Sequence, residues 1–98
     1  MNITSYSIEK LEDPTGILEG NRYEIITYMQ VDEEDELYSE NGLYVKIIFA
    51  AIENNSRIAQ YNIYEDVTHK YLDFELEEDE LLYLEQFCKK AVIDLGAE

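Results

Sequence analysis

Residues 43–52 read Leu43-Tyr44-Val45-Lys46-Ile47-Ile48-Phe49-Ala50-Ala51-Ile52. This is the strongest strand signal in the chain, because it is nearly all apolar and rich in branched and aromatic residues. Its only charged residue is Lys46. We therefore expect a central strand that is covered on much of both faces. Turn residues bound it on each side, with Asn41-Gly42 before it and Glu53-Asn54-Asn55-Ser56 after it.

Further strand patterns lie on both sides of this central stretch. Residues 23–31 alternate in hydropathy, and residues 57–64 repeat the same kind of pattern. Residues 3–11 predict a first strand, and residues 71–76 predict a short fifth one. Turn signals at Asp13-Pro14-Thr15-Gly16 and Gly20-Asn21 separate the strand predicted over residues 3–11 from the one over residues 23–31. The pattern is typical of an antiparallel meander of four to five strands.

After the strands, the hydrophobic period changes from two to 3.6 residues over residues 77–95. Acidic residues fill the start of this segment, where the helix dipole favours anions, and Gly96 is suited to end it. The apolar face predicted for this helix consists of Leu81, Leu84, Cys88, Ala91, Val92 and Leu95. We therefore predict a single α+β domain over residues 1–98, with one C-terminal helix packed on a face of the sheet.

The charge balance excludes several classes of partner. Asp and Glu number 23 against seven Lys and Arg, so the formal net charge is −16. Phosphate surfaces would repel such a chain, so we expect neither nucleic acid nor an anionic membrane as a partner. Much of the excess lies in residues 73–80 and in one acidic run. That run, Asp32, Glu33, Glu34, Asp35 and Glu36, is predicted to be a solvated, mobile surface loop.

No pattern in the sequence predicts a metal, a cofactor or a catalytic centre. The spacing of a calcium-binding EF-hand is absent, and five consecutive acids cannot all converge on one ion. His69 and Cys88 are the only residues of their kinds, too few for a zinc site. Cys88 falls on the apolar helix face, so a buried structural thiol is expected. Neither a secretory signal nor a membrane-spanning run is present, which favours a cytoplasmic protein.

The second face of the sheet is the candidate functional surface. One helix cannot cover both faces, and Ile26, Tyr28, Tyr44 and Ile48 are the apolar residues left for the uncovered one. Tyrosine is enriched at binding interfaces because its ring offers apolar area together with a polar tip. The alternative interpretation of the same residues is that their long tyrosine side chains simply cover a small core.

The sequence also resembles a known family. The resemblance rests on residues 9–14, on residues 35–46 and on residues 70–76, which read EKLEDP, DELYSENGLYVK and KYLDFEL. They are similar to segments of a small family of acidic proteins of unassigned activity from Bacillus-type Gram-positive bacteria. The resemblance implies a bacterial, cytoplasmic setting, and it implies no activity and no site residues.

These observations lead to two function hypotheses. The first is a small non-enzymatic interaction or regulatory protein that binds a basic protein, or its own copy, through a tyrosine-lined face with an acidic rim. A nucleic-acid mimic is a special form of this hypothesis. The second is a small enzyme or ligand-binding domain whose Glu and Tyr groups line a pocket. Convergent buried carboxylates would favour the second, and a flat apolar face would favour the first.

Overall fold

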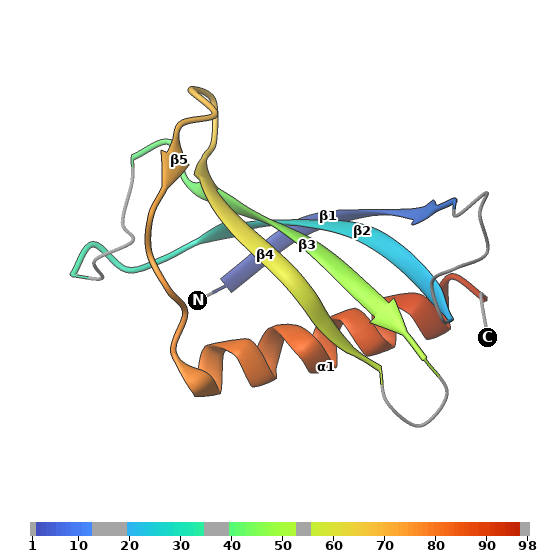
Figure 1. The fold of residues 1–98 in the computed structure, drawn as a ribbon. Helices are drawn as coiled ribbons and strands as arrows, with labels where there is room; N and C mark the ends of the chain where they lie inside the picture. Colours follow the sequence, from blue (N-terminus) through green and yellow to red (C-terminus); the bar gives the residue numbers. More distant parts are fainter. Residues whose placement is uncertain (1, 13–19, 35–39, 53–55, 97–98) are drawn as a thin grey trace.

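The computed structural model describes residues 2–12, 20–34, 40–52 and 56–96. Five strands form one antiparallel sheet in the order β1-β2-β3-β4-β5, with one helix, α1, along one side (Figure 1). The elements are β1 (Asn2–Leu11), β2 (Asn21–Gln30), β3 (Leu43–Ala51), β4 (Arg57–Glu65), β5 (Tyr71–Leu72) and α1 (Glu78–Asp94). Each strand pairs with the next one along the chain, so the predicted meander with a C-terminal helix is confirmed.

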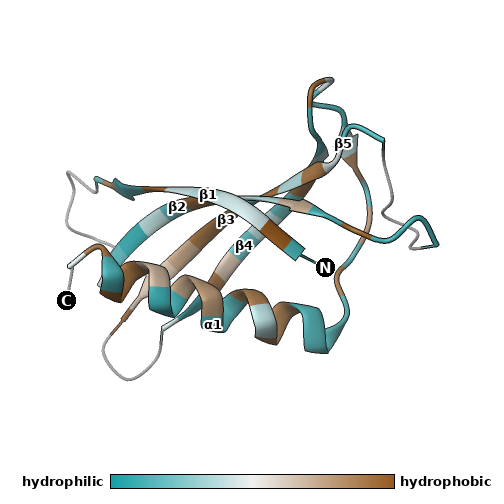
Figure 2. Ribbon diagram, turned by 180° about the vertical axis from the view of Figure 1, so that it is seen from behind, coloured by the Kyte–Doolittle hydropathy of each residue, from teal (hydrophilic) through white to brown (hydrophobic). Residues whose placement is uncertain are grey.

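Alternating side chains of the sheet build the core on the face that α1 covers. Along β2 from Arg22 to Met29 and along β3 from Leu43 to Ala50, every second residue is buried, and the residues between them are half-buried apart from buried Ala50. Figure 2 shows α1 lying along one side of the sheet, with apolar segments in β3. The core cluster consists of Tyr23, Ile25, Met29, Leu43, Val45, Ile47, Phe49, Ile63, Leu76, Leu84, Cys88 and Val92.

The helix begins and ends where its sequence predicts. The Glu80 carboxylate accepts a hydrogen bond of 2.9 Å from the backbone N–H of Glu77, the N-cap residue. Three acids in the first turn face the positive end of the helix dipole. Gly96 adopts a φ of +77°, and its N–H donates to the Ile93 carbonyl, which ends the helix.

The structure corrects three details of the predicted fold. Leu95 is 51% exposed, because it is the C-cap residue beyond the last helical turn and none of the described strands covers it. The fifth strand contains only two residues, because the chain after Leu72 leaves the sheet to reach α1. β3 is central, but α1 covers only one of its faces (Figure 1), and on the other face Ala50 alone is buried whereas Tyr44, Lys46 and Ile48 are half-buried. The predicted turns at residues 13–16 and 53–55 lie outside the described residues.

A tyrosine row on the open face of the sheet

We call the side of the sheet away from α1 the open face. Across it, strand register places four tyrosines opposite one another. Tyr28 of β2 lies opposite Tyr44 of β3, Tyr44 lies opposite Tyr64 of β4, and Tyr64 lies opposite Tyr71 of β5. Residues directly opposite in neighbouring strands point to the same side of a sheet. The four rings therefore form one line across four strands, which we call the tyrosine row.

The rings of the tyrosine row contact one another in sequence. Ring centroids are 5.6 Å apart between Tyr28 and Tyr44, 5.2 Å between Tyr44 and Tyr64, and 5.8 Å between Tyr64 and Tyr71. All three distances are in the range of favourable aromatic pairs. Tyr71 is 51% exposed, and the other three are half-buried. The row is therefore a connected aromatic surface that remains open to solvent.

His69 joins the row from the turn between β4 and β5. Its Nδ1 lies 2.9 Å from the Tyr44 hydroxyl, a hydrogen bond whose donor depends on the histidine tautomer. The backbone holds this position, because the His69 N–H donates to the Glu65 carbonyl and the Glu65 N–H donates to the Lys70 carbonyl. Partial burial, followed by the neighbouring Tyr64, Tyr28 and Asp66, raises the pKa of Tyr44. Its hydroxyl thus stays protonated at neutral pH.

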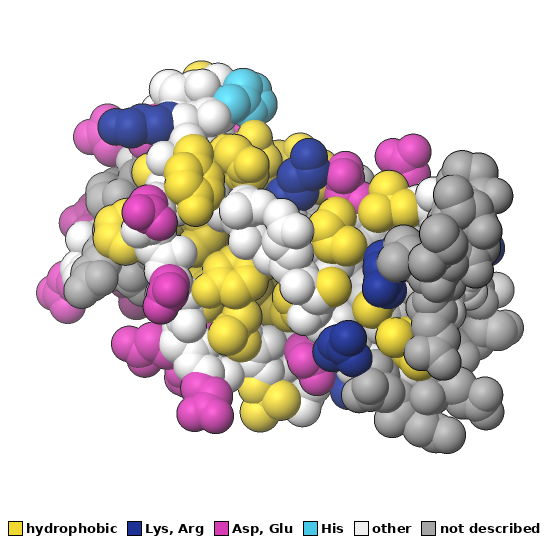
Figure 3. All heavy atoms as spheres, in the orientation of Figure 1, with side chains coloured by type: hydrophobic (Ala, Val, Ile, Leu, Met, Phe, Trp, Pro, Cys, Tyr) yellow, Lys and Arg dark blue, Asp and Glu magenta, His cyan; other side chains and the backbone are white. Residues whose placement is uncertain are grey.

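Charges are distributed unevenly along the open face. At the end opposite the tyrosine row, Arg22 and Arg57 lie on either side of Ala50 of β3. Between the two ends, Lys46 Nζ lies 3.7 Å from Glu24 Oε2. Figure 3 shows most acidic side chains of this view on the left and the basic ones in the middle and on the right, apart from one basic group at the upper left. The open face therefore has an aromatic end with acidic neighbours and a basic end.

The structure places all four predicted interface residues on the open face. Tyr28 and Tyr44 belong to the tyrosine row, whereas Ile26 lies opposite Lys46 and Ile48 lies opposite Glu24. All four are half-buried. The two isoleucines lie nearer the middle of the face and add apolar area beside the row.

Sequence reasoning missed the other members of the row. Tyr64 was expected on a strand, but its contact with Tyr44 depends on a bulge at Ala59 that shifts the register of β3 and β4. Tyr71 and His69 come together with the row only through the β4–β5 turn. The turn residues Glu53-Asn54-Asn55-Ser56 predicted a hairpin between the two strands, which is the one signal that could have paired Tyr44 with Tyr64.

The acidic run divides between described and undescribed residues. Asp32, Glu33 and Glu34 are exposed and follow the end of β2, at the same end of the sheet as Tyr28. Asp35 and Glu36 lie outside the described residues. Within the described ranges, no group of three or more His, Cys, Asp or Glu side chains is arranged to hold a metal ion. No helix in that part of the chain is both long and apolar enough to cross a membrane.

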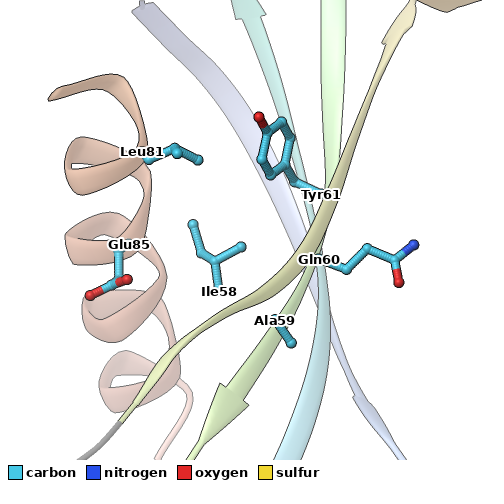
Figure 4. A pocket seen from close by; sticks show the side chains of 6 residues that line it. All are labelled: Ile58, Ala59, Gln60, Tyr61, Leu81 and Glu85. Carbon is cyan, nitrogen blue, oxygen red and sulfur yellow. The ribbon is translucent and has the colours of Figure 1, made fainter. Parts of the chain in front are cut away.

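A hollow at the outer edge of β4, the edge away from β3, is a further candidate pocket. It has a volume of about 310 Å³ and lies between β4 and α1, lined by Ile58, Ala59, Gln60, Tyr61, Leu81 and Glu85 (Figure 4). Glu85 is the one carboxylate in this lining, so no pair of carboxylates converges there. Cys88 is fully buried, and burial raises its pKa to about 12, which leaves the thiol unreactive at neutral pH.

The sequence comparisons identify a family. The model of a family of unknown function, DUF6509, matches residues 1–94. The chain belongs to this family. No curated protein and no solved structure matches the chain. Membership therefore assigns no chemistry, and an interpretation of the open face depends on its geometry.

Proposed function

We propose that the chain is a small non-enzymatic interaction protein that binds a basic protein partner through the tyrosine row. The supporting observation is the row itself, four connected rings across four strands on the face that α1 leaves uncovered. Tyrosines whose only role was to cover the core would not need to contact one another on the open face. The row offers a partner a flat aromatic surface with polar hydroxyl tips.

The surroundings of the row suit cationic side chains. The face of a tyrosine ring attracts an Arg or Lys side chain, with about 0.5–1 kcal/mol gained at an exposed site. Asp66 lies close enough to Tyr44 to affect its pKa, and Glu33 and Glu34 follow the strand that carries Tyr28. Rings and carboxylates at one end of the face would thus act together on arginines or lysines of a partner.

A second copy of the chain is the other candidate partner. Arg22 and Arg57 lie at the far end of the same face. Two copies packed with their open faces together and their strands reversed, about a two-fold axis, would place arginines of one over the tyrosine row of the other. Repulsion between two chains of net charge −16 opposes this dimer, so added salt should tighten it. A complex with a basic protein should weaken with salt instead. Sedimentation velocity at several salt concentrations separates the two behaviours.

Other forms of the function receive less support. A nucleic-acid mimic needs carboxylates spaced like phosphates, and the described strands place only Glu9 and Glu24 opposite each other on the open face. An enzyme or ligand-binding domain needs convergent groups in a pocket. The hollow between β4 and α1 offers one carboxylate, and the three carboxylates that line the adjoining hollow all lie along the surface of α1. The proposal includes the bacterial source and the cytoplasmic setting that the family resemblance implies.

Affinity capture with three forms of the chain tests the proposal. The baits are the wild type, the double variant Tyr28→Ser/Tyr64→Ser, and Tyr83→Ser, which removes a 46% exposed tyrosine from α1. We expect a basic protein that the wild type and Tyr83→Ser retain at low salt and that the double variant loses. Equal capture by all three baits would contradict a role for the tyrosine row.

A further inference from the structure

The free edge of β4 carries a second binding surface, separate from the tyrosine row. β5 pairs only with Ile63 and Tyr64, at the end of β4. Along residues 57–62, no described strand pairs with the outer edge of β4. The fifth position of the sheet is therefore only partly filled, and the rest of it exposes main-chain hydrogen-bonding groups that a further strand can use.

An apolar floor lies beside this free edge. Ile58 of β4 and Leu81 of α1 point toward each other across the hollow of about 310 Å³ (Figure 4). A second hollow, of about 500 Å³, shares Leu81 and Glu85 with the first and continues along α1. Leu82, in its lining, is 56% exposed. A chain lying along β4 would have apolar surface beneath alternate side chains.

The two hollows together form a groove between β4 and α1, and the α1 side of this groove is acidic. Glu78, Asp79 and Glu85 of α1 line the two hollows. Among the described residues, one ion pair involves these carboxylates: Lys89 Nζ lies 3.5 Å from Glu85 Oε1. A basic segment would therefore be attracted to the groove, whereas a second copy of a chain with a net charge of −16 would be repelled.

We infer that the groove between β4 and α1 binds an extended basic segment of a partner protein, which adds to the sheet as a strand below β5. Main-chain hydrogen bonds to β4 would supply affinity. Side chains of the added strand that point to the α1 side would be of two kinds: an apolar one would rest on Ile58 and Leu81, and a basic one would face the carboxylates of α1. This surface is distinct from the open face, so binding at the groove does not depend on binding at the tyrosine row.

A bulge limits how the added strand can pair. The register of β4 against β3 shifts at Ala59, which leaves this residue as the extra one on β4. Bulges at sheet edges interrupt regular pairing and discourage indiscriminate association. Pairing would thus run along residues 60–62, in line with β5, and Ile58 would contribute through its side chain.

Titration of the full chain with three synthetic peptides tests this inference. The probe is an acetylated lysine–valine octapeptide, Lys-Thr-Val-Thr-Lys-Thr-Val-Thr, whose lysines and valines share one side of an extended strand. Its effects on backbone amides are followed by NMR. We expect shift changes at residues 58–62 and 78–85. A glutamate–valine octapeptide should not bind. A lysine–valine octapeptide with N-methyl groups on alternate residues should bind much more weakly, because it cannot pair with a strand edge.

Matched variants separate the groove from the general negative charge. Glu78→Gln/Glu85→Gln should weaken binding of the lysine–valine peptide about tenfold. Glu33→Gln/Glu34→Gln, with the same loss of charge in the loop after β2, should leave it nearly unchanged. The inference would be overturned if both variants lost binding equally or if the methylated peptide bound as well as the unmethylated one. It would also be overturned by shifts at the tyrosine row instead of the groove, or by no binding at millimolar peptide. The peptide comparisons use the wild type, so they decide the matter even where a variant unfolds.

Discussion

At the scale of single residues, the candidate function depends on where strand register places side chains. Tyr44 is the clearest case, because it contacts Tyr28, Tyr64 and His69. It lies on the same strand as buried core residues, and only the alternation of a strand separates the two roles. One residue of slippage in β3 would bury Tyr44 and expose Val45, so the packing of the core also fixes the aromatic surface.

Gly20 is required for a close approach as well as for its backbone conformation. Its φ is +71°, and a Cβ there would lie 2.7 Å from the Ala51 carbonyl oxygen. Gly42 has a φ of +76°, but a Cβ there would meet its nearest atom at 3.5 Å. We expect Gly42→Ala to cost about 1–2 kcal/mol, the usual cost of a left-handed residue. Gly20→Ala should cost clearly more in urea titration, and equal costs would show that the contact relaxes freely.

Cys88 gives a pH-dependent prediction. Burial, followed by the charge of Glu85, raises the thiol pKa from 9.0 to about 12. A raised pKa means that the folded state holds the proton more tightly, so stability is complete below pH 9 and falls as pH rises toward 12. We expect the free energy of unfolding of the wild type to fall relative to Cys88→Ala over this interval. A constant difference between the two proteins would contradict the burial of the thiol.

At the scale of elements, α1 offers a matched pair of leucines. Leu84 is fully buried against the sheet, whereas Leu82 is 56% exposed. Leu84→Ala should cost about 2–5 kcal/mol, the usual range for a buried leucine. Leu82→Ala should change stability by about 0.5 kcal/mol or less. A loss below about 1 kcal/mol for Leu84→Ala in urea titration would mean that the helix does not pack as described.

Elements with a strong periodic pattern could be predicted from the sequence, and elements fixed by tertiary contacts could not. Residues 43–52 and the helical stripe around Leu84 carry local signals, and the structure has a strand and a helix there. The fifth strand is short because Leu76 must reach the core and the Tyr61 hydroxyl, a contact with no local signal. Leu95 fits the helical period, but the period does not show where the sheet beneath it ends.

The candidate site was predicted in part for the same reason. Alternation along β2 and β3 was enough to assign Tyr28 and Tyr44 to the face away from the core. Their contact with each other follows from the register of the two strands, which the sequence did not specify. His69 reaches Tyr44 through a turn in which Val67 and His69 have positive φ, a conformation that is uncommon outside glycine and most unusual for a β-branched residue such as Val67.

At the scale of the whole molecule, charge repulsion opposes folding. A net charge of −16 on 98 residues should make the free energy of unfolding rise with added sodium chloride, because salt screens the repulsion. Glu33→Gln/Glu34→Gln should stabilise the chain slightly, by about 0.5 kcal/mol or less. Urea titrations of both proteins at low and high salt measure the effect. Destabilisation by the double variant would show that these exposed acids make structural contacts.

The most direct test of the central proposal is an NMR titration with an acetylated hexa-arginine peptide. If the tyrosine row binds cationic side chains, amide shifts will concentrate around Tyr28, Tyr44, Tyr64, His69 and Tyr71. They will be lost in Tyr28→Ser/Tyr64→Ser and kept in Tyr83→Ser. Shifts confined to the acidic first turn of α1 and to Glu33 and Glu34, unchanged in the double variant, would contradict the proposal and show that the peptide responds to negative charge alone.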